Sequence, residues 1–270
     1  MGTETPGDGA RPEGDNMTLP RLGALPAQVR PGQPRLAPSL RMMARQAPPR
    51  LLRDHIDPGP LMLGNDTLGD CTSAGLGNHI RATAALAGFQ VDVRTADAIQ
   101  FYERSTGYTP ADPATDQGGV ECDVLTYASR NGYALENDTL FPIWGTAEPD
   151  DFNGMRNIMT AMGSAYLGVR LALADQHDGI LDTTTPGDQT PGSWGDHCLI
   201  TWAYTGTGDA DLASLLTWGT VRKATWRWVR SRIMECHGVA WRQLVPASGM
   251  TLMGGDWRAL VEANREYLAG

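Results

Sequence analysis

The stretch 64-GNDTLGDCTSAGLGNHIRATAAL-86 contains a loop followed by a helix with a cysteine at the junction. The first seven residues are rich in glycine and aspartate, which is typical of a loop. From Cys71 onward, apolar residues recur at helical spacing, so we predict a helix that begins at Cys71 and ends near Gly88. The first turn of a helix offers unpaired N–H groups and partial positive charge, which favour a thiolate. Cys71 is therefore a candidate nucleophile.

A nucleophilic cysteine needs a base within hydrogen-bond reach, and His197 is our candidate. It begins segment 197–204, in which residues alternate with the period of a β-strand. The simpler alternative is that Cys71 is a buried structural cysteine, the commonest state of a free thiol. Considered by itself, Cys71 fits that alternative better, so the choice depends on the surrounding residues.

Helical patterns dominate the first half of the chain and strand patterns the second. The sequence predicts helices at 95–104, 120–130, 153–162, 224–233 and 256–267, and strands at 165–173, 197–204, 214–218 and 238–244. No internal repeat and no strand–helix–strand alternation occurs. We therefore predict an α+β fold.

The first 57 residues have a different composition from the rest. They hold 9 of the 18 prolines, so we predict an extended arm over 1–57 and a folded domain over 58–270. Seven arginines and no acidic residue occur between Arg21 and Arg53, and subtracting them from the formal net charge of −9 leaves −16 for the remainder. A basic arm on an acidic body predicts binding to other protein subunits. Its proposed contact residues are Arg21, Arg30, Arg35, Arg41 and Arg45.

Other functional classes find no support in the composition. Aromatic residues are not interleaved with the arginines of the arm, so nucleic-acid binding is not supported. No apolar run approaches the roughly 18 residues that span a bilayer. The N-terminus lacks the basic start and apolar stretch of a signal peptide, so we expect a cytoplasmic or virion protein with free thiols. The adjacent pairs His197-Cys198 and Cys236-His237 lack the usual spacing of metal ligands, so we predict no metal and no cofactor.

Several short motifs, in order from about residue 62 to 244, resemble those of the papain-like cysteine peptidases. Asn65 and Gly69 stand six and two residues before Cys71, 116-DQGG-119 resembles the Gly-Gly segment, and 217-TWG-219 resembles the end of the Asn-Ser-Trp-Gly motif. The resemblance implies a helical half and an antiparallel strand half with a cleft between them. It assigns Cys71 as nucleophile, His197 as base and Asn65 as oxyanion donor. The implied cleft residues are Gly69, Asp70, Gly118, Gly119, Trp194 and Trp218.

The departures from this family pattern concern the support of the histidine. In the Asn-Ser-Trp-Gly comparison, the residue that orients the imidazole corresponds to Leu216, which offers no hydrogen bond. Asp196 adjoins His197, but neighbours along a strand point to opposite faces. The sequence therefore does not decide whether the Cys71–His197 pair is catalytically active. Activity would require another group to orient His197.

Three functions are compatible with these observations. The first is a phage or prophage virion structural protein, in the capsid or tail, whose papain-like domain is degenerate; the arm and Leu216 both favour it. The second is an active thiol hydrolase that cleaves peptide or isopeptide bonds. The third is a tail-associated cell-wall peptidase or amidase, because 70-DCTS-73 partly resembles the motif of such enzymes.

Overall fold

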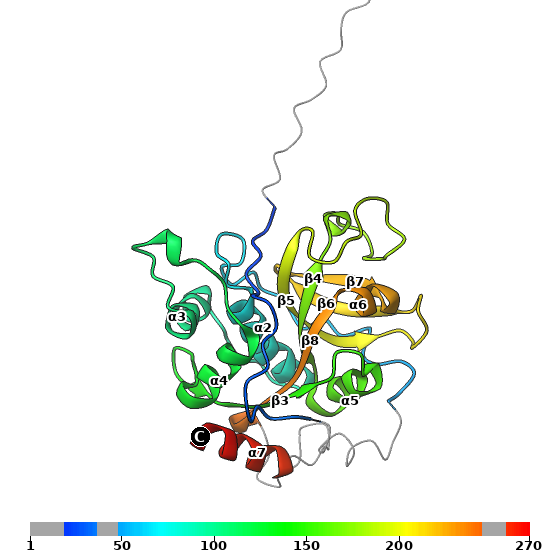
Figure 1. The fold of residues 1–270 in the computed structure, drawn as a ribbon. Helices are drawn as coiled ribbons and strands as arrows, with labels where there is room; N and C mark the ends of the chain where they lie inside the picture. The colour runs from blue at the N-terminus through cyan, green and yellow to red at the C-terminus, as the bar shows by residue number, and fades with distance from the viewer. Residues whose placement is uncertain (1–18, 37–47, 245–257) are drawn as a thin grey trace, which may run out of the picture.

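The computed structural model describes residues 19–36, 48–244 and 258–270, which form a helical half and a sheet half (Figure 1). The helical half contains α2 (Cys71–Leu86), α3 (Thr95–Thr106) and α4 (Glu121–Asn131). A two-stranded ribbon of β1 (Tyr133–Ala134) and β2 (Thr139–Leu140) follows. The prediction of an α+β fold is confirmed.

The sheet half is built on six antiparallel strands in the order β3-β8-β4-β5-β6-β7. The strands are β3 (Pro142–Ala147), β4 (Ala165–Leu171), β5 (Gly195–Tyr204), β6 (Leu212–Thr217), β7 (Thr220–Thr225) and β8 (Ile233–Trp241). Helices α5 (Phe152–Met162), α6 (Trp226–Arg232) and α7 (Arg258–Ala269) complete the fold, with short 3-10 turns η1 (Pro113–Thr115), η2 (Leu173–Asp175) and η3 (Arg242–Leu244).

The sequence prediction lacks the short strands β1 and β2 and two strands of the six-stranded sheet, β3 and β7. All six residues of β3 are buried, so its sequence PIWGTA shows none of the alternation that identifies a strand with one exposed face. Strand β7 is short and forms a hairpin with β6. The helix predicted at 224–233 is only α6, because Thr225 caps it by accepting a hydrogen bond from the Trp228 N–H.

The sheet divides two cores, and α2 packs on one of its faces. Cys198 and Ile200 of β5 belong to the same core as Leu76 and Ile80 of α2. Leu199 belongs to the core on the other face, as the alternation in this segment predicted. This packing brings the first turn of α2 against the beginning of β5.

The described part of the arm lies on the protein's own body, between the two halves (Figure 1). It forms isolated parallel bridges at Ala24 with Gly119 and at Arg35 with Thr146 of edge strand β3. Arg30 forms an ion pair with Asp123, at the start of α4. Arg41 and Arg45, also proposed as contact residues, lie outside the described residues.

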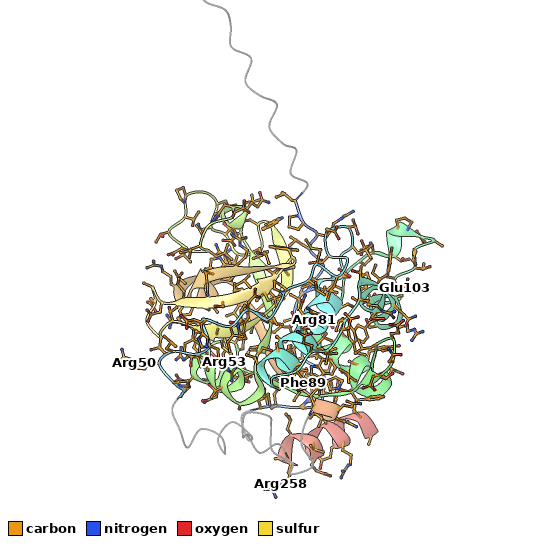
Figure 2. All side chains as sticks on the ribbon, turned by 180° about the vertical axis from the view of Figure 1, so that it is seen from behind. Arg50, Arg53, Arg81, Phe89, Glu103 and Arg258 are labelled. Carbon is orange, nitrogen blue, oxygen red and sulfur yellow. The ribbon has the colours of Figure 1, made fainter. Side chains whose placement is uncertain are left out.

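The chain then crosses the back of the molecule, where Arg50 and Arg53 lie (Figure 2). Leu52 forms a bridge with Tyr204, the last residue of β5. The Arg53 guanidinium donates to the carbonyls of Met159, Thr160 and Gly163 at the C-terminal end of α5. These contacts satisfy carbonyls that the end of a helix leaves without partners.

A buried ion pair anchors α6 in the sheet half and gives a stability prediction. Asp175 accepts hydrogen bonds from Arg232 and Trp228, at 2.8 and 2.9 Å, and both charged side chains are almost completely buried. Replacing Asp175 with alanine leaves a buried guanidinium without its carboxylate. We expect a loss of about 3–5 kcal/mol in the free energy of unfolding, measured by urea denaturation.

The control is Glu262→Ala, which removes the exposed carboxylate partner of Arg265 in α7. Water and salt screen such a pair, so we expect little change in stability. A similar loss for both variants would show that the Asp175–Arg232 pair has no special importance.

Candidate active site

Cys71 begins α2, as the sequence predicts, and only 1% of its surface is exposed. Its Sγ accepts a hydrogen bond from the backbone N–H of Cys198, at 3.4 Å. Because Cys198 directly follows His197, the sulfur lies against β5 beside the residue that carries the imidazole. The structure therefore brings the sulfur to the backbone of β5 next to His197, and no hydrogen bond between the Cys71 sulfur and the imidazole occurs among the described residues.

The imidazole of His197 is held on one edge and on one face. Its Nε2 lies 2.6 Å from the Thr217 Oγ1, and the ring of Trp218 stacks on it with centroids 4.2 Å apart. Its other nitrogen, Nδ1, has no hydrogen-bond partner within the described ranges. A hydroxyl can donate or accept, so Thr217 can support the neutral ring with a lone pair on Nδ1 as well as the imidazolium.

Thr217 holds the position beside the imidazole that the sequence comparison gave to Leu216. Leu216 pairs with Ile200 in the antiparallel register of β5 and β6, which places it on the sheet face opposite His197. Thr217, one residue later, lies on the same face as the imidazole. The sequence comparison left His197 without a group to hydrogen-bond its ring. In the structure the Thr217 hydroxyl, one residue after Leu216, is that hydrogen-bond partner.

The hairpin turn after Thr217 explains the Trp-Gly pair. Thr217 pairs with Thr220, so the connection between β6 and β7 has two residues, Trp218 and Gly219. Both have positive φ, 46° and 66°, as a tight type I′ turn requires. Trp218 also lies near Trp194, with ring centroids 5.5 Å apart, and both line a cavity of about 310 Å³.

Asp116 links the loop before Cys71 to the Gly118-Gly119 segment of the helical half. Its carboxylate accepts from the Gly69 N–H at 3.0 Å and from the Tyr102 hydroxyl at 2.7 Å. That hydroxyl in turn accepts from the Gly118 N–H at 2.9 Å. Asp116 thus joins the loop before the nucleophile to the Gly118-Gly119 segment. Sequence analysis assigned Asp116 no role, although it directly precedes the quoted Gln-Gly-Gly.

Asn65, predicted to donate to an oxyanion, is buried and donates its amide to the Leu68 carbonyl at 3.0 Å. Within the described part of the chain, no hydrogen bond joins Asn65 to Cys71. Its proposed catalytic role stays a prediction. The backbone N–H of Cys71, at the start of α2, is a further candidate donor.

The arm passes directly over the sulfur. The Gly23 carbonyl accepts from the Gly119 N–H at 2.8 Å, and the Leu25 N–H donates to the Gly119 carbonyl at 2.9 Å. On the other side, the Trp218 indole donates to the Arg21 carbonyl at 3.1 Å. A Cβ at residue 23 would lie 1.8 Å from the Gly69 carbonyl oxygen, so only glycine fits.

Burial sets the protonation of both candidate catalytic groups. Burial raises the pKa of the Cys71 thiol far above its usual value, and the N–H groups of Cys198 and Gly23 only partly oppose it. Burial also lowers the pKa of His197 to about 3. Near neutral pH the covered site therefore holds a thiol and a neutral imidazole, not the reactive ion pair.

Comparison with solved structures identifies the architecture. Digestive procathepsin L 3 from the larval midgut of Tenebrio molitor matches with a TM-score of 0.52 and 13% identity, covering 73% of this chain and 72% of its own. Xylellain, a cysteine protease from Xylella fastidiosa, matches with a TM-score of 0.50 and 13% identity, covering 82% and 96%. The fold is papain-like.

The structure shares its fold with these two proteins, and identities of 13% establish nothing beyond the fold. No protein-family model matches the sequence, and no curated protein matches it either. The likeness to phage proteins, inferred from the sequence, receives no support from these matches. Within the described ranges, no helix is both long and apolar enough to cross a membrane.

Asp70, next to the candidate nucleophile, gives a pH prediction. Its carboxylate is buried without a hydrogen-bond partner in the described structure, and burial raises its pKa to about 8, against the influence of the Asn65 amide. Between about pH 4 and 8 the folded protein keeps this proton while the unfolded chain has lost it. Folding therefore becomes less favourable as the pH rises through this range.

We expect Asp70→Asn to remove this loss, because its side chain is neutral at every pH. The free energy of unfolding of the variant, relative to the natural protein, should increase from pH 4 to pH 8 in urea titrations. Asp92→Asn, at an exposed loop position that does not contribute to the raised pKa of Asp70, is the control. If the pH slope of Asp70→Asn equals that of the natural protein, Asp70 does not carry a raised pKa.

Proposed function

We propose that this chain is a thiol hydrolase that cleaves peptide or isopeptide bonds and is kept inactive by residues 21–25 of its own arm. The carrying observation is the arrangement of Cys71, His197 and Thr217 underneath the arm. Cys71 at a helix start, a histidine on the residue before the one whose N–H contacts the sulfur, and a hydroxyl on one ring nitrogen are parts that thiol catalysis uses. The papain-like fold supports the same proposal.

The proposed reaction uses the unpartnered nitrogen of His197. The imidazole takes the proton of Cys71, and the thiolate attacks the carbonyl carbon to form a tetrahedral oxyanion. The Cys71 N–H would donate to that oxyanion. His197 then gives its proton to the leaving amine as the C–N bond breaks, which leaves a thioester on Cys71. Water, deprotonated by His197, hydrolyses the thioester and restores the thiol.

The arm has features of a blocking segment and not of a substrate. At Cys71 the arm presents the Gly23 N–H, a hydrogen-bond donor that lowers the pKa of the thiol, and a donor is no target for a nucleophile. The Gly23 carbonyl is occupied by the Gly119 N–H. With the arm displaced, water would reach the sulfur and the imidazole, and the desolvation that keeps both groups neutral would decrease.

Displacing the arm should activate the thiol. Gly23→Val introduces a side chain where the Gly69 carbonyl leaves no room, so we expect the segment to leave the site. Cys71 should then react with iodoacetamide at least about tenfold faster at pH 7, because a thiolate fraction becomes accessible. The measurement is the rate of Cys71 carbamidomethylation, followed by peptide mass spectrometry.

Ala27→Val is the matched control, because it adds a side chain at an exposed position of the same arm. It should leave the slow labelling unchanged. Adding His197→Ala to Gly23→Val should remove the acceleration if the imidazole activates the sulfur. Equal rates in Gly23→Val and Ala27→Val would overturn the blocking role of the arm.

Thr217 should act as a positioning residue for His197. In the Gly23→Val background, we expect Thr217→Val to lower kcat/KM about 10²-fold on a library of fluorogenic peptide amides, because the ring loses the partner of Nε2. Thr217→Ser keeps the hydroxyl and should retain most of the activity. The acidic limb of the pH profile should also shift in Thr217→Val alone. Equal effects of valine and serine would exclude the hydroxyl as the orienting group.

The virion role and the cell-wall peptidase role stay predictions from the sequence. The contacts of residues 19–36 with the protein's own body account for an ordered arm without a neighbouring subunit. Thr217 likewise accounts for the absence of a polar residue at Leu216. The two observations that favoured a degenerate structural protein are thus equally compatible with a covered hydrolase, which we prefer.

A further inference from the structure

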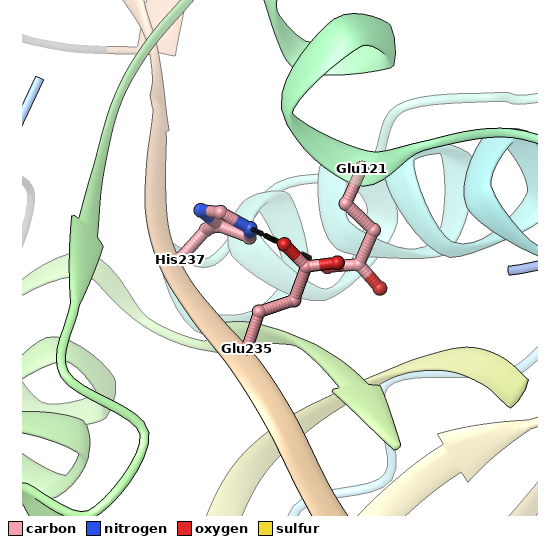
Figure 3. Close-up of side chains that lie close together, drawn as sticks. All are labelled: Glu121, Glu235 and His237. Carbon is pink, nitrogen blue, oxygen red and sulfur yellow. Dashed lines mark hydrogen bonds and ion pairs between the residues drawn. The ribbon is translucent and has the colours of Figure 1, made fainter. Parts of the chain in front are cut away.

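Three titratable side chains form a sealed cluster between the helical half and the sheet (Figure 3). Glu121 lies at the first residue of α4, and Glu235 and His237 lie on the same face of β8. The His237 Nε2 is 3.1 Å from the Glu235 Oε2 and 3.6 Å from the Glu121 Oε2. The three donor atoms all lie within 4.8 Å of one another.

The carboxylates of this cluster are deeply buried and poorly satisfied. The side chain of Glu121 is fully buried, that of Glu235 is 6% exposed, and neither Glu121 oxygen has a hydrogen-bond partner in the described structure. The Glu235 Oε1 also lacks one. Figure 3 shows both carboxylates turned towards His237. Buried carboxylates without partners are costly, so the arrangement calls for a compensating group.

No lysine or arginine supplies that compensation in the ion pairs formed within residues 19–36, 48–244 and 258–270. Among the ion pairs of the described residues, Glu121 and Glu235 pair only with His237. Even a protonated imidazole would leave one negative charge uncompensated if both carboxylates are ionised. A divalent cation with a neutral imidazole would balance the charge completely.

The separations fit the edges of a small metal polyhedron. Zinc bonds of about 2.0–2.2 Å to nitrogen and oxygen, at tetrahedral angles, place neighbouring donors roughly 3.3–3.6 Å apart. The observed 3.1 and 3.6 Å lie close to that range. We propose that Glu121, Glu235 and His237 form a binding site for one zinc ion. A fourth position would remain for water or for the Cys198 thiol, which adjoins Glu121.

Strand β4 leaves room for the cluster at Gly168. A Cβ at this position would lie 2.8 Å from the Glu235 Cγ and 3.0 Å from the Glu121 Oε1. Any larger residue would push the carboxylates away from His237. The backbone of β4 thus forms one wall of the proposed site.

The outer partners of His237 also suit a metal ligand. Its Nδ1 lies 3.0 Å from the Thr146 Oγ1, which also accepts from the Gln33 amide at 2.6 Å. With zinc on Nε2, the Nδ1–H would donate to Thr146, the kind of second hydrogen bond that metal-bound histidines usually make. Gln33 belongs to the arm, so the docked arm would complete the surroundings of the metal.

The location suggests a structural task for the ion. Glu121 follows Gly119, which bonds the arm, by two residues, and Glu235 and His237 come from a central strand of the sheet. Zinc would therefore fasten the wall of the candidate active site to the sheet. This differs from our expectation from the sequence, which considered only the adjacent Cys-His pairs and predicted no metal.

Zinc binding can be measured independently of catalysis. Full-length Cys71→Ala protein, in which the candidate nucleophile cannot capture zinc, is treated with a chelator, desalted and titrated with zinc chloride. We expect one equivalent to bind by isothermal titration calorimetry and elemental analysis, with a rise in Tm because zinc binds the folded state. Glu121→Gln and Glu235→Gln, each in that background, should lose the bound zinc and the rise in Tm.

Two further variants make the test specific. Glu266→Gln, at an exposed position of α7, removes the same charge away from the cluster and should bind zinc normally. Thr146→Val should weaken binding about 10- to 100-fold while keeping the stoichiometry. If Cys71→Ala protein takes up no zinc, or if Glu121→Gln binds it equally well, the cluster is only a hydrogen-bonded trio that shares a proton, and the proposal fails.

Discussion

The contact between the first turn of α2 and strand β5 is the constraint on which the candidate site depends. The Cys198 N–H donates to the Cys71 sulfur, so the nucleophile and the histidine-bearing strand are fixed together by a backbone group. The contact fixes the Cys71 side chain through its sulfur, and the core that Leu76 and Ile80 share with Cys198 and Ile200 of β5 holds the helix in place. The walls, the turn at Trp218 and the arm are all arranged around this junction.

Desolvation by burial determines the charge states of Cys71 and His197. The helix start favours a thiolate, yet full burial opposes charge on both Cys71 and His197. Burial dominates in the covered state, as the raised pKa of the thiol and the lowered pKa of the imidazole show. Burial thus opposes the reactive ion pair without a change in either side chain. Residues 21–25 are held by hydrogen bonds to Asn65, Gly119 and Trp218.

The structure buries two polar groups of different kinds, the His197–Thr217 pair and the cluster of Glu121, Glu235 and His237. Thr217 gives His197 a neutral partner that can adapt to either protonation state. The cluster of Glu121, Glu235 and His237, on the other side of β4, concentrates negative charge without such flexibility. The His197–Thr217 pair has a hydrogen bond in either protonation state of the ring. Both Glu121 oxygens and the Glu235 Oε1 lack such partners in the described structure, which is why we propose a cation between the two carboxylates.

The sequence by itself determined the local features of this protein. The helix start at Cys71, a strand that includes His197 and the α+β class follow from propensity, capping and periodicity, which act over a few residues. Only the tertiary structure decided which distant residues meet. A register shift of one residue between β5 and β6 would have put Leu216, not Thr217, beside His197. The path of the arm and the meeting of Glu121 with β8 were likewise decided by packing across the whole fold, because no local pattern specifies contacts between distant segments.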